Sequence, residues 1–477
     1  MARPCCALLW RDDTTAGRLV SIRRILIANR GEIATRIIRT CRTLGIETVL
    51  AASEADRNSL PAQLADRTVC IGPARASESY LKVETIVQAA LGTGANAIHP
   101  GYGFLSERAA LARLCEEQGV IFIGPTAEQI EAVGDKLRAR AAAEAAQVPV
   151  VPGGAVESAD EALSLAERVG VPLLVKAVGG GGGRGMKRVD RISDLAAAME
   201  LASSEAGAAF GDARVYLERF VTRGRHVEVQ VLGDGEGRVI HLGERDCSVQ
   251  RRFQKLIEET PAPGLTDSFR RQLHEAAVRF SERLFYRGAG TVEFLVDMDR
   301  EAFYFLEMNA RIQVEHPVTE AVTGVDLVAE QIAIAAGEGL RLTQAQVHNR
   351  GCALECRVNA EDPDADFQPS PGVVTDVSWP SGAGIRVDTH IVSGAKVPPF
   401  YDSLLAKIIT HTPERATTLA LMQNAVSSTR VAGVATNLSF HSTVLGNAEF
   451  QTGGVDTGFV ARLLERSPLL QRKVQHG

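Results

Sequence analysis

The sequence predicts a multidomain protein of mixed α/β and α+β class that begins with a doubly wound parallel sheet. Three observations lead to this fold class. A buried-type strand at 24–29, an amphipathic helix at 32–44 and a second strand at 47–52 form a βαβ unit. Five consecutive glycines at 179–183 join two apolar strands. Polar and apolar residues alternate strictly from 307 to 315, which is typical of a strand with two different faces.

The composition excludes several classes of protein. The length of 477 residues suits about two to four domains, and the net charge of -6 shows none of the basic excess of nucleic-acid-binding proteins. No apolar run approaches the roughly 20 residues that a membrane helix requires. Eight cysteines without a CxxC pair favour reduced thiols over disulfides or zinc. We therefore expect a cytoplasmic protein without nucleic-acid or membrane partners.

The first domain is predicted to be Rossmann-like and to span 23–135, after an N-terminal extension at 1–22 that we expect to be disordered. The turn at 29–32 lacks the GxGxxG spacing that seats a dinucleotide, so a nicotinamide cofactor is not expected. The loop at 99–107 has two glycines around Tyr102, which lets it lie close to a ligand at the carboxyl edge of the sheet.

The glycine run belongs to a smaller unit that follows a helix at 136–147. The run connects strand VPLLVKAV with strand MKRV, and VYLERFV is predicted to be a third strand. Because no helix and no GK[ST] sequence follows the glycines, they form neither a Rossmann turn nor a P-loop. They predict a mobile lid at about 150–222 whose backbone N–H groups close over phosphates; a flexible linker is the alternative.

The alternating segment is the second candidate for function. If it is extended, its polar residues share one face: Glu307, Asn309, Arg311, Gln313 and Glu315. The preceding strand TVEFLV adds the carboxylate of Glu293. The pattern fits either a convergent polar site or the solvated edge of an antiparallel sheet. We expect the strand to leave the sheet within this segment, as binding loops often do.

The remaining segments complete the predicted organisation. The sequence 226–249 predicts a hairpin, and the basic segment 250–255 after it is by default a solvated surface. Helices around 325–337 lead to a final domain at 350–466 with short strands and Gly/Pro turns, followed by a tail at 467–477.

Six motifs occur in one order along the chain: ANRGEIA (28–34), HPGYGFLSE (99–107), GGGGGRGM (179–186), ERDCSVQRRFQK (244–255), EMNARIQVEHPVTE (307–320) and ECRVNAEDP (355–363). Through them the chain resembles the biotin carboxylase subunit family of the acetyl-CoA carboxylase type, from about 23 to 465. The resemblance implies an ATP-grasp fold: the Rossmann-like domain, an ATP-grasp domain at 136–345 that includes the glycine-rich lid, and a C-terminal α+β biotin carboxylase domain at 350–466. It implies that MgATP phosphorylates bicarbonate to carboxyphosphate, which then carboxylates biotin on a separate carrier protein.

The resemblance also assigns the nucleotide and metal sites. The implied ATP-binding residues are Lys136, Lys176, Gly182, Gly183, Glu218, Arg219, Phe220, Val221, His226, Gln250, Glu293 and Glu307. The two lysines match phosphate contacts, 218–221 the adenine edge, and His226 with Gln250 the ribose side. The implied ligands of Mg²⁺ or Mn²⁺ are Glu293, Glu307 and Asn309, which offer the hard oxygen atoms that these ions prefer.

Bicarbonate and biotin are assigned to neighbouring residues. The implied bicarbonate cradle is Lys255, Arg311, Gln313, the Val314 N–H and Arg357, and the implied catalytic residues are Lys255, Arg311, Glu315 and Arg357. Glu315 matches the base that removes the bicarbonate proton. Arg357 matches the residue that stabilises the ureido oxygen of biotin when its N1′ is deprotonated. Tyr102 matches a wall of the biotin pocket, with a purely structural tyrosine as the alternative.

The sequence departs from the family pattern at a few positions. Phe253 stands where relatives often have a histidine that touches the nucleotide, so weaker nucleotide binding is one expectation. Arg36 and Arg39 match the family's dimer contact, whereas Thr43 and Ala383 depart from it. We expect a homodimer on this basis.

Three functions remain open at this stage. The first is the initial half-reaction of acetyl-CoA carboxylase, which leads to malonyl-CoA for fatty acid synthesis, or of a propionyl-CoA or pyruvate carboxylase system. The second is another ATP-grasp ligase, such as a carbamoyl-phosphate synthetase half, and the third is a protein that only binds nucleotide, in a regulatory or structural role. The sequence has no biotinylation motif and no carboxyltransferase segment, so we expect a biotin carboxyl carrier protein and carboxyltransferase subunits as partners.

Overall fold

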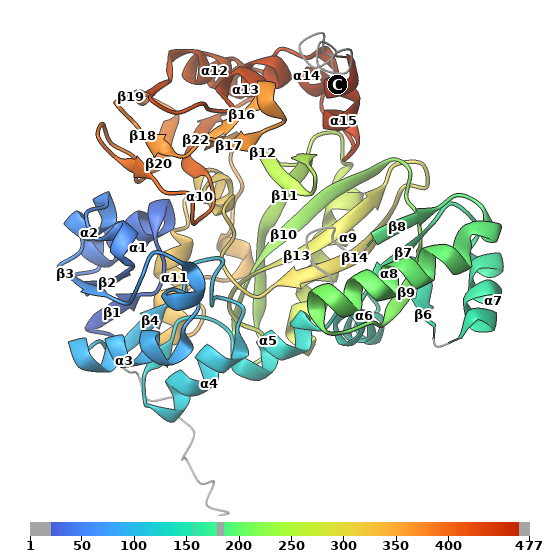
Figure 1. Ribbon diagram of the computed structural model, residues 1–477, viewed down its shortest axis with the longest axis horizontal. Helices are drawn as coiled ribbons and strands as arrows, with labels where there is room; N and C mark the ends of the chain where they lie inside the picture. Colours follow the sequence, from blue (N-terminus) through green and yellow to red (C-terminus); the bar gives the residue numbers. More distant parts are fainter. Residues whose placement is uncertain (1–20, 157, 179–185, 467–477) are drawn as a thin grey trace, which may run out of the picture.

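A computed structural model describes residues 21–156, 158–178 and 186–466 (Figure 1). The predicted extension and tail lie largely outside these residues, as do Gly182 and Gly183. Ser21 and Ile22 are described, and Ile22 packs into the core of the first domain. Within the described residues, no helix is long and apolar enough to cross a membrane.

The N-terminal part is a five-stranded parallel sheet in the order β3-β2-β1-β4-β5 (Figure 1). Its strands are Arg24–Ile27 (β1), Glu47–Ala52 (β2), Arg67–Cys70 (β3), Ala97–His99 (β4) and Ile121–Phe122 (β5). Its helices are Gly31–Thr43 (α1), Leu60–Leu64 (α2), Val83–Thr93 (α3), Ala109–Glu117 (α4) and Ala127–Gly134 (α5). The loops after β1 and β4 leave adjacent strand ends, and the Asn29 side chain joins them by donating to the carbonyls of Pro100 and Tyr102, both at 2.7 Å. This is the edge at which such sheets bind ligands.

The predicted lid contains a four-stranded sheet in the order β6-β9-β7-β8. Its strands are Gly153–Ala155 (β6), Leu173–Ala177 (β7), Met186–Val189 (β8) and Val215–Arg219 (β9). The associated helices are Lys136–Ala145 (α6), Ala159–Val169 (α7) and Leu195–Phe210 (α8). Strands β7 and β8 pair antiparallel, so the prediction that the glycine run joins strand to strand is confirmed at both of its ends.

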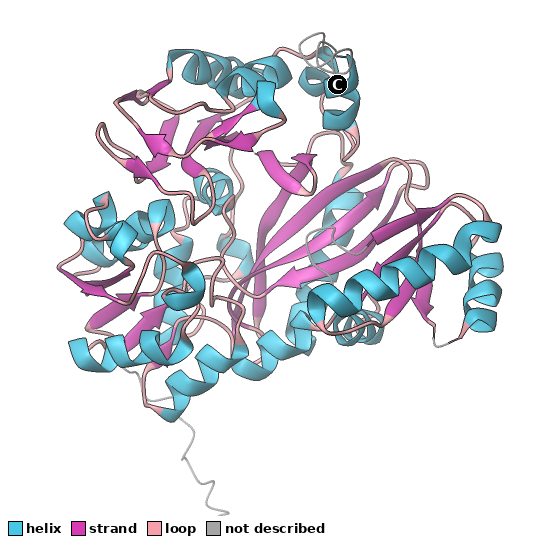
Figure 2. Cartoon of the chain, viewed as in Figure 1, coloured by secondary structure: helices cyan, strands magenta, loops and turns pink. Residues whose placement is uncertain are grey.

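The largest sheet is antiparallel, with eight strands in the order β14-β13-β10-β11-β12-β15-β22-β20 (Figure 2). Its strands are Gly224–Asp234 (β10), Val239–Arg251 (β11), Gln254–Thr260 (β12), Arg287–Asp297 (β13), Ala302–Asn309 (β14), Cys352–Asn359 (β15), Ile385–Thr389 (β20) and Leu404–Thr412 (β22). The helices between them are Asp267–Arg283 (α9), His316–Thr323 (α10) and Leu327–Ala335 (α11). Because β12 pairs with β15, the sheet runs without a break past the predicted domain limits at 345–350.

The C-terminal part packs helices and short strand pairs against the end of this sheet (Figure 1). The helices are Arg415–Ser428 (α12), Leu438–Leu445 (α13), Ala448–Thr452 (α14) and Phe459–Arg466 (α15). The paired strands are Glu361–Asp362 (β16) with Gln368–Pro369 (β17), Gly372–Val373 (β18) with Lys396–Val397 (β21), and Asp376–Ser378 (β19) with Arg430–Ala432 (β23).

The alternating segment divides as predicted. Strand β14 ends at Asn309, residues 310–315 form a loop, and α10 begins at His316. Of the five polar residues, only Glu307 and Asn309 therefore lie on one face of a strand. The loop carries the other three polar residues, and Arg311 and Gln313 converge with the strand residues through side-chain contacts.

Candidate active site

A cavity of about 1000 Å³ lies where the first sheet, the four-stranded sheet and the large sheet meet. Of the predicted site residues that the structure describes, all but Glu315 line this cavity. Glu315 lies behind the wall, where it contacts Lys255 and Arg357. The two predicted lid glycines, Gly182 and Gly183, lie outside the described residues.

The predicted metal ligands come from the hairpin β13–β14. Glu293 is paired directly with Glu307, and the Asn309 side chain donates to Glu293 Oε1 at 2.7 Å. Burial raises the pKa of Glu307, and the neighbouring Glu293 charge raises it further. Two carboxylates that repel each other on facing strands, with an amide beside them, form a set of hard oxygen donors suited to Mg²⁺ or Mn²⁺.

His226 lies against the same carboxylates. Its Nε2 is 3.0 Å from Glu293 Oε2, on the strand next to β13. Against the effect of burial, the Lys255 and His226 charges hold the pKa of Glu293 far below its usual range. The side chain predicted to contact ribose is thus engaged with a predicted metal ligand in this structure, and its ribose contact stays a prediction.

Lys255 joins three buried carboxylates. Its Nζ lies 2.5 Å from Glu228, 3.1 Å from Glu293 and 2.7 Å from Glu315. Burial lowers the pKa of a lysine, but here the three carboxylates outweigh it and hold the pKa of Lys255 well above its usual value. Glu228 in turn binds the fully buried Arg245 at 2.6 Å. Lys255 is therefore a fixed cation between the predicted metal ligands and the predicted bicarbonate cradle.

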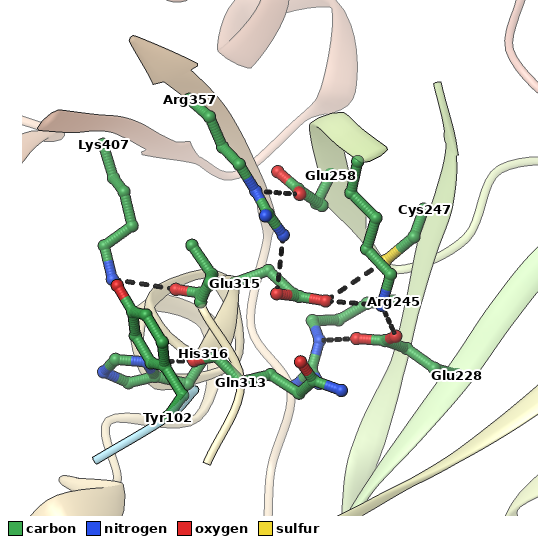
Figure 3. Close-up of polar contacts among 12 residues, drawn as sticks. Tyr102, Glu228, Arg245, Cys247, Glu258, Gln313, Glu315, His316, Arg357 and Lys407 are labelled. Atoms are coloured by element: carbon green, nitrogen blue, oxygen red, sulfur yellow. Dashed lines mark hydrogen bonds and ion pairs between the residues drawn. The ribbon is translucent and has the colours of Figure 1, made fainter. Parts of the chain in front are cut away.

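Glu315 lies between two cations. Lys255 contacts one of its oxygens, and the Arg357 guanidinium donates to the other at 2.8 Å (Figure 3). Although burial opposes it, these charges hold the pKa of Glu315 well below its usual range. These charges therefore favour the ionised form of Glu315.

Arg357 contacts a second carboxylate, Glu258, with Nε 2.6 Å from Oε1 (Figure 3). Glu258 is fully buried, and burial raises its pKa to about 7 against the effect of the Arg357 charge. The guanidinium is thus held from two sides, and its position is fixed by β12 and by the loop before α10.

Arg311 organises the remaining cradle residues. Its Nε donates to Glu107 Oε2 at 2.8 Å, its Nη1 to Gln313 Oε1 at 2.9 Å and its Nη2 to Asn309 Oδ1 at 3.1 Å. Glu107 also accepts the backbone N–H of Ala310 at 3.0 Å. The loop HPGYGFLSE of the first domain therefore holds the loop that follows β14.

Lys176 and Glu218, two of the predicted ATP-binding residues, line the cavity and form an ion pair. Lys176 Nζ lies 2.6 Å from Glu218 Oε2, and Arg140 contacts the other oxygen at 3.2 Å. Burial lowers the pKa of Lys136, which lines the cavity beside them. The two lysines predicted to contact phosphates are therefore brought together.

Two backbone N–H groups of the predicted adenine-binding segment 218–221 are already hydrogen-bonded within the protein. The backbone N–H groups of Arg219 and Phe220 donate to Pro152 and Pro172, at 2.9 and 3.0 Å. They cannot also bind a purine without breaking these bonds. The Arg219 side chain donates to the Tyr304 hydroxyl at 2.6 Å. A backbone contact with adenine would therefore fall on the carbonyls of this segment or on Val221.

Gln250 and Phe253 line the cavity at the hairpin β11–β12. Phe253 occupies the turn with a φ of 66° and is 57% exposed. The expected loss of a nucleotide contact at Phe253 stays a prediction.

Sequence reasoning missed several residues that hold the site: Glu32, Glu107, Glu228, Arg245, Glu258 and Lys407. Two of these carried a usable signal. Glu107 closes the glycine-containing loop motif, and Lys407 interrupts the apolar run LLAKII of β22. A charged residue within such a run is rarely buried without a partner.

The fold and the site define the class. A four-stranded unit with a glycine run, set beside a sheet that carries paired carboxylates, is an ATP-grasp arrangement, as predicted. Three family models match the chain: "Biotin carboxylase, N-terminal domain" at 21–130, "Carbamoyl-phosphate synthase L chain, ATP binding domain" at 135–343 and "Biotin carboxylase C-terminal domain" at 355–462. The chain belongs to the biotin carboxylase family, and its activity is the ATP-dependent carboxylation of biotin.

Similar proteins agree with this assignment. The chain is 51% identical over 442 residues to a biotin carboxylase of Nostoc sp., covering 92% of this chain and 99% of the relative. It is 48% identical to a pyruvate carboxylase subunit of Methanothermobacter thermautotrophicus, covering 92% and 89%. The biotin carboxylase domain dimer of Hydrogenobacter thermophilus 2-oxoglutarate carboxylase, solved with MgADP, ADP and bicarbonate, superposes with a TM-score of 0.88 at 44% identity and covers 92% of this chain and 97% of that one.

Proposed function

We propose that this biotin carboxylase performs the first half-reaction of an acetyl-CoA carboxylase, on biotin attached to a separate carrier protein. The observation that carries the site assignment is that the predicted metal, bicarbonate and biotin residues open into one cavity. A carboxylated intermediate formed at one end can react at the other without entering bulk solvent.

Glu293, Glu307 and Asn309 would hold Mg²⁺ or Mn²⁺. Glu293 and Glu307 face each other across the β13–β14 pairing and Asn309 lies beside them, which supports this assignment. The bound ion would neutralise charge on the phosphates of ATP. Lys136 and Lys176, which line the same cavity, would contact the same phosphates.

Bicarbonate would lie against Arg311, Gln313, the Val314 N–H and Lys255. An oxygen of bicarbonate attacks the γ-phosphorus of ATP, ADP leaves, and the bicarbonate proton passes to Glu315. Lys255 and Arg357 keep Glu315 ionised before substrate binds. When an anion in the cradle shares their charge, the basicity of Glu315 rises and proton transfer becomes favourable.

Arg357 and Tyr102 would serve the second step, in which N1′ of biotin takes the carboxyl group from carboxyphosphate and the departing phosphate takes the N1′ proton. A guanidinium fixed from two sides can neutralise the charge that develops on the ureido oxygen.

The partners, location and domain limits are part of the same proposal. We propose a homodimer that acts with a biotin carboxyl carrier protein and carboxyltransferase subunits in the cytoplasm. The domain limits proposed are 23–135, 136–345 and 350–466.

The two arginines predicted to lie at the dimer contact have partners within this chain. Arg36 is bound to Glu320 and Asp326, and Arg39 lies 3.9 Å from Asp388. A propionyl-CoA or pyruvate carboxylase system is the second candidate, favoured by the similarity to the Methanothermobacter protein.

The test is ADP release measured with and without bicarbonate and free biotin. Biotin is expected to raise the bicarbonate-dependent rate, and Arg357→Ala is expected to abolish this increase while ATP binding is kept. If wild-type ADP release does not respond to biotin, or if Arg357→Ala weakens ATP binding equally, the site assignment is wrong. Reconstitution with labelled bicarbonate and each candidate carboxyltransferase identifies the acceptor.

A further inference from the structure

Lys407 is a fully buried lysine in the middle of β22, and it connects three parts of the chain. Its Nζ donates to the carbonyl of Val314 at 2.8 Å and lies 3.1 Å from Glu32 Oε1 on α1. The hydroxyl of Tyr102 is hydrogen-bonded to the same Glu32 oxygen. One ammonium group therefore joins the C-terminal part, the N-terminal domain and the loop that carries the predicted bicarbonate cradle.

Stability alone does not explain this arrangement. A buried ion pair pays a large desolvation cost, and replacing it with apolar residues of similar size is often neutral or stabilising. Burial raises the pKa of Glu32, and the Lys407 charge opposes that effect. The Lys407–Glu32 pair is therefore weak evidence of a stabilising role. Its contacts with the Val314 carbonyl and with Tyr102 indicate instead that it holds these groups in position.

The contacts fix two consecutive peptide groups of the loop. His316 Nδ1 lies 2.7 Å from the Gln313 carbonyl, and because a carbonyl only accepts, the ring must donate this bond. A trans peptide is planar, with its N–H directed opposite to its C=O. Holding the Gln313 carbonyl therefore directs the Val314 N–H away from His316. Lys407 holds the next carbonyl, that of Val314, and with it the peptide from which Glu315 extends (Figure 3).

We propose that Lys407 is a positioning residue that couples the bicarbonate cradle to the biotin pocket. Through the Val314 carbonyl it holds the peptide group that directly follows the cradle residue Val314 and from which Glu315 extends. Through Glu32 it holds the hydroxyl of Tyr102. The inference rests on the proposed roles of Val314 and Tyr102, and it adds that one buried cation sets the geometry of both half-sites.

The test variant is the double substitution Lys407→Met with Glu32→Gln. It removes both charges, so no unpaired buried charge remains, and the new amide at position 32 could still bond to Tyr102. We expect a Tm close to wild type, a KM for bicarbonate raised about tenfold and a KM for ATP changed less than about twofold, because the residues predicted to bind ATP lose no positioning contact. The KM for free biotin is expected to rise as well.

The matched control is Glu244→Gln with Arg270→Met, which removes a buried ion pair of 2.6 Å between β11 and α9, outside the cavity. Its KM for bicarbonate should stay within about twofold of wild type.

A wild-type bicarbonate KM in the Lys407 double variant overturns the inference. So does an equal rise in the KM values for ATP and bicarbonate, which would indicate general damage. If the double variant fails to fold, Lys407→Arg decides: it keeps the charge but moves the donor, so a raised bicarbonate KM supports the inference and an unchanged one refutes it.

Gln313→Ala, measured in parallel, separates this inference from the proposed site. If Gln313→Ala raises the bicarbonate KM and the Lys407 double variant does not, only the role of Lys407 is refuted. If Gln313→Ala leaves the KM unchanged, the cradle assignment itself fails, and the inference fails with it.

Discussion

The two faces of β11 carry buried charges that are compensated in opposite ways. On the outer face, Glu244 is bound by Arg270 at 2.6 Å, by His274 at 2.7 Å and by the N–H of Ala262 at 3.1 Å. Despite its burial, these partners lower the pKa of Glu244 to about 2. The next residue, Arg245, points to the inner face, because successive side chains of a strand alternate.

The inner face has more carboxylates than cations. Arg245, Lys255 and Arg357 are shared by four buried acids: Glu228, Glu258, Glu293 and Glu315. A fifth, Glu355, is fully buried, and neither of its side-chain oxygens has a hydrogen-bond partner among the described residues. Burial raises the pKa of Glu258 to about 7 on this face. The outer cluster is a single carboxylate held by three donors. The inner cluster shares its cations among several carboxylates and shifts their pKa values in both directions, a pattern that is typical of functional sites.

The largest expected effect is on the activity of Glu315→Gln. This change removes the proposed proton acceptor and should reduce bicarbonate-dependent ADP release about 1000-fold, within the range found for general bases. ATP binding should remain, because Glu315 does not line the cavity. Steady-state ADP release and an ATP titration measure the two quantities. A loss of less than about tenfold would mean that another group takes the proton.

Glu244→Gln is expected to show the reverse, with a large effect on stability and little on activity. It leaves Arg270 and His274 without their anion and should lower the free energy of unfolding by about 3 kcal/mol. Urea unfolding measures the stability, and kcat should stay within about twofold. The exposed Glu275→Gln on the same helix is the control. An inactive but stable Glu244→Gln variant would contradict the distinction between the two faces.

Residues with a local pattern could be predicted, and those whose partners are distant in sequence could not. The alternation of Glu307 and Asn309 and the strand at each end of the glycine run are visible in short windows, and motif order supplied their roles. Glu258 gave no such signal, because its burial depends on β15 pairing beside β12 after three intervening helices and two strands. The same pairing made the sheet continuous across 345–350, where the change in composition had suggested a boundary.

For Lys407, the local sequence indicates burial but does not indicate the partners of the side chain. Its place in an apolar run indicates burial, but nothing local names Glu32 or the Val314 carbonyl as its partners. Those contacts arise only when α1, β22 and the loop before α10 are packed together. Long-range packing of polar groups is therefore the part of the site that the sequence leaves open.

The pH dependence of stability should have opposite signs at Glu244 and at Glu258. Glu244 has a lowered pKa, so its contribution is present above about 4.5 and is lost as the pH falls towards 2. Glu258 has a pKa raised from 4.5 to about 7, so its neutral form favours the folded state below 4.5, and that contribution is lost as the pH rises through 7. Glu258→Gln should therefore gain about 2–4 °C in Tm relative to wild type between pH 5 and 8. Thermal scans across this range measure it, and a constant difference would show that Glu258 does not titrate there.

The smallest expected effect is that of Glu355→Gln. Burial raises the pKa of Glu355 well above its usual value, and Glu258, its partner across the β12–β15 pairing, raises it further against the effect of the Lys407 charge. A carboxyl group that is already neutral resembles an amide in size and charge, so the substitution should change the free energy of unfolding by less than about 0.5 kcal/mol. An ionised Glu355 would behave differently, because its replacement would relieve an uncompensated buried charge and raise the Tm by several degrees. Urea unfolding at pH 7 separates the two cases. A large stabilisation would mean that Glu355 is ionised. The inner face would then carry one more negative charge, and Arg245, Lys255 and Arg357 would balance a smaller share of its carboxylates.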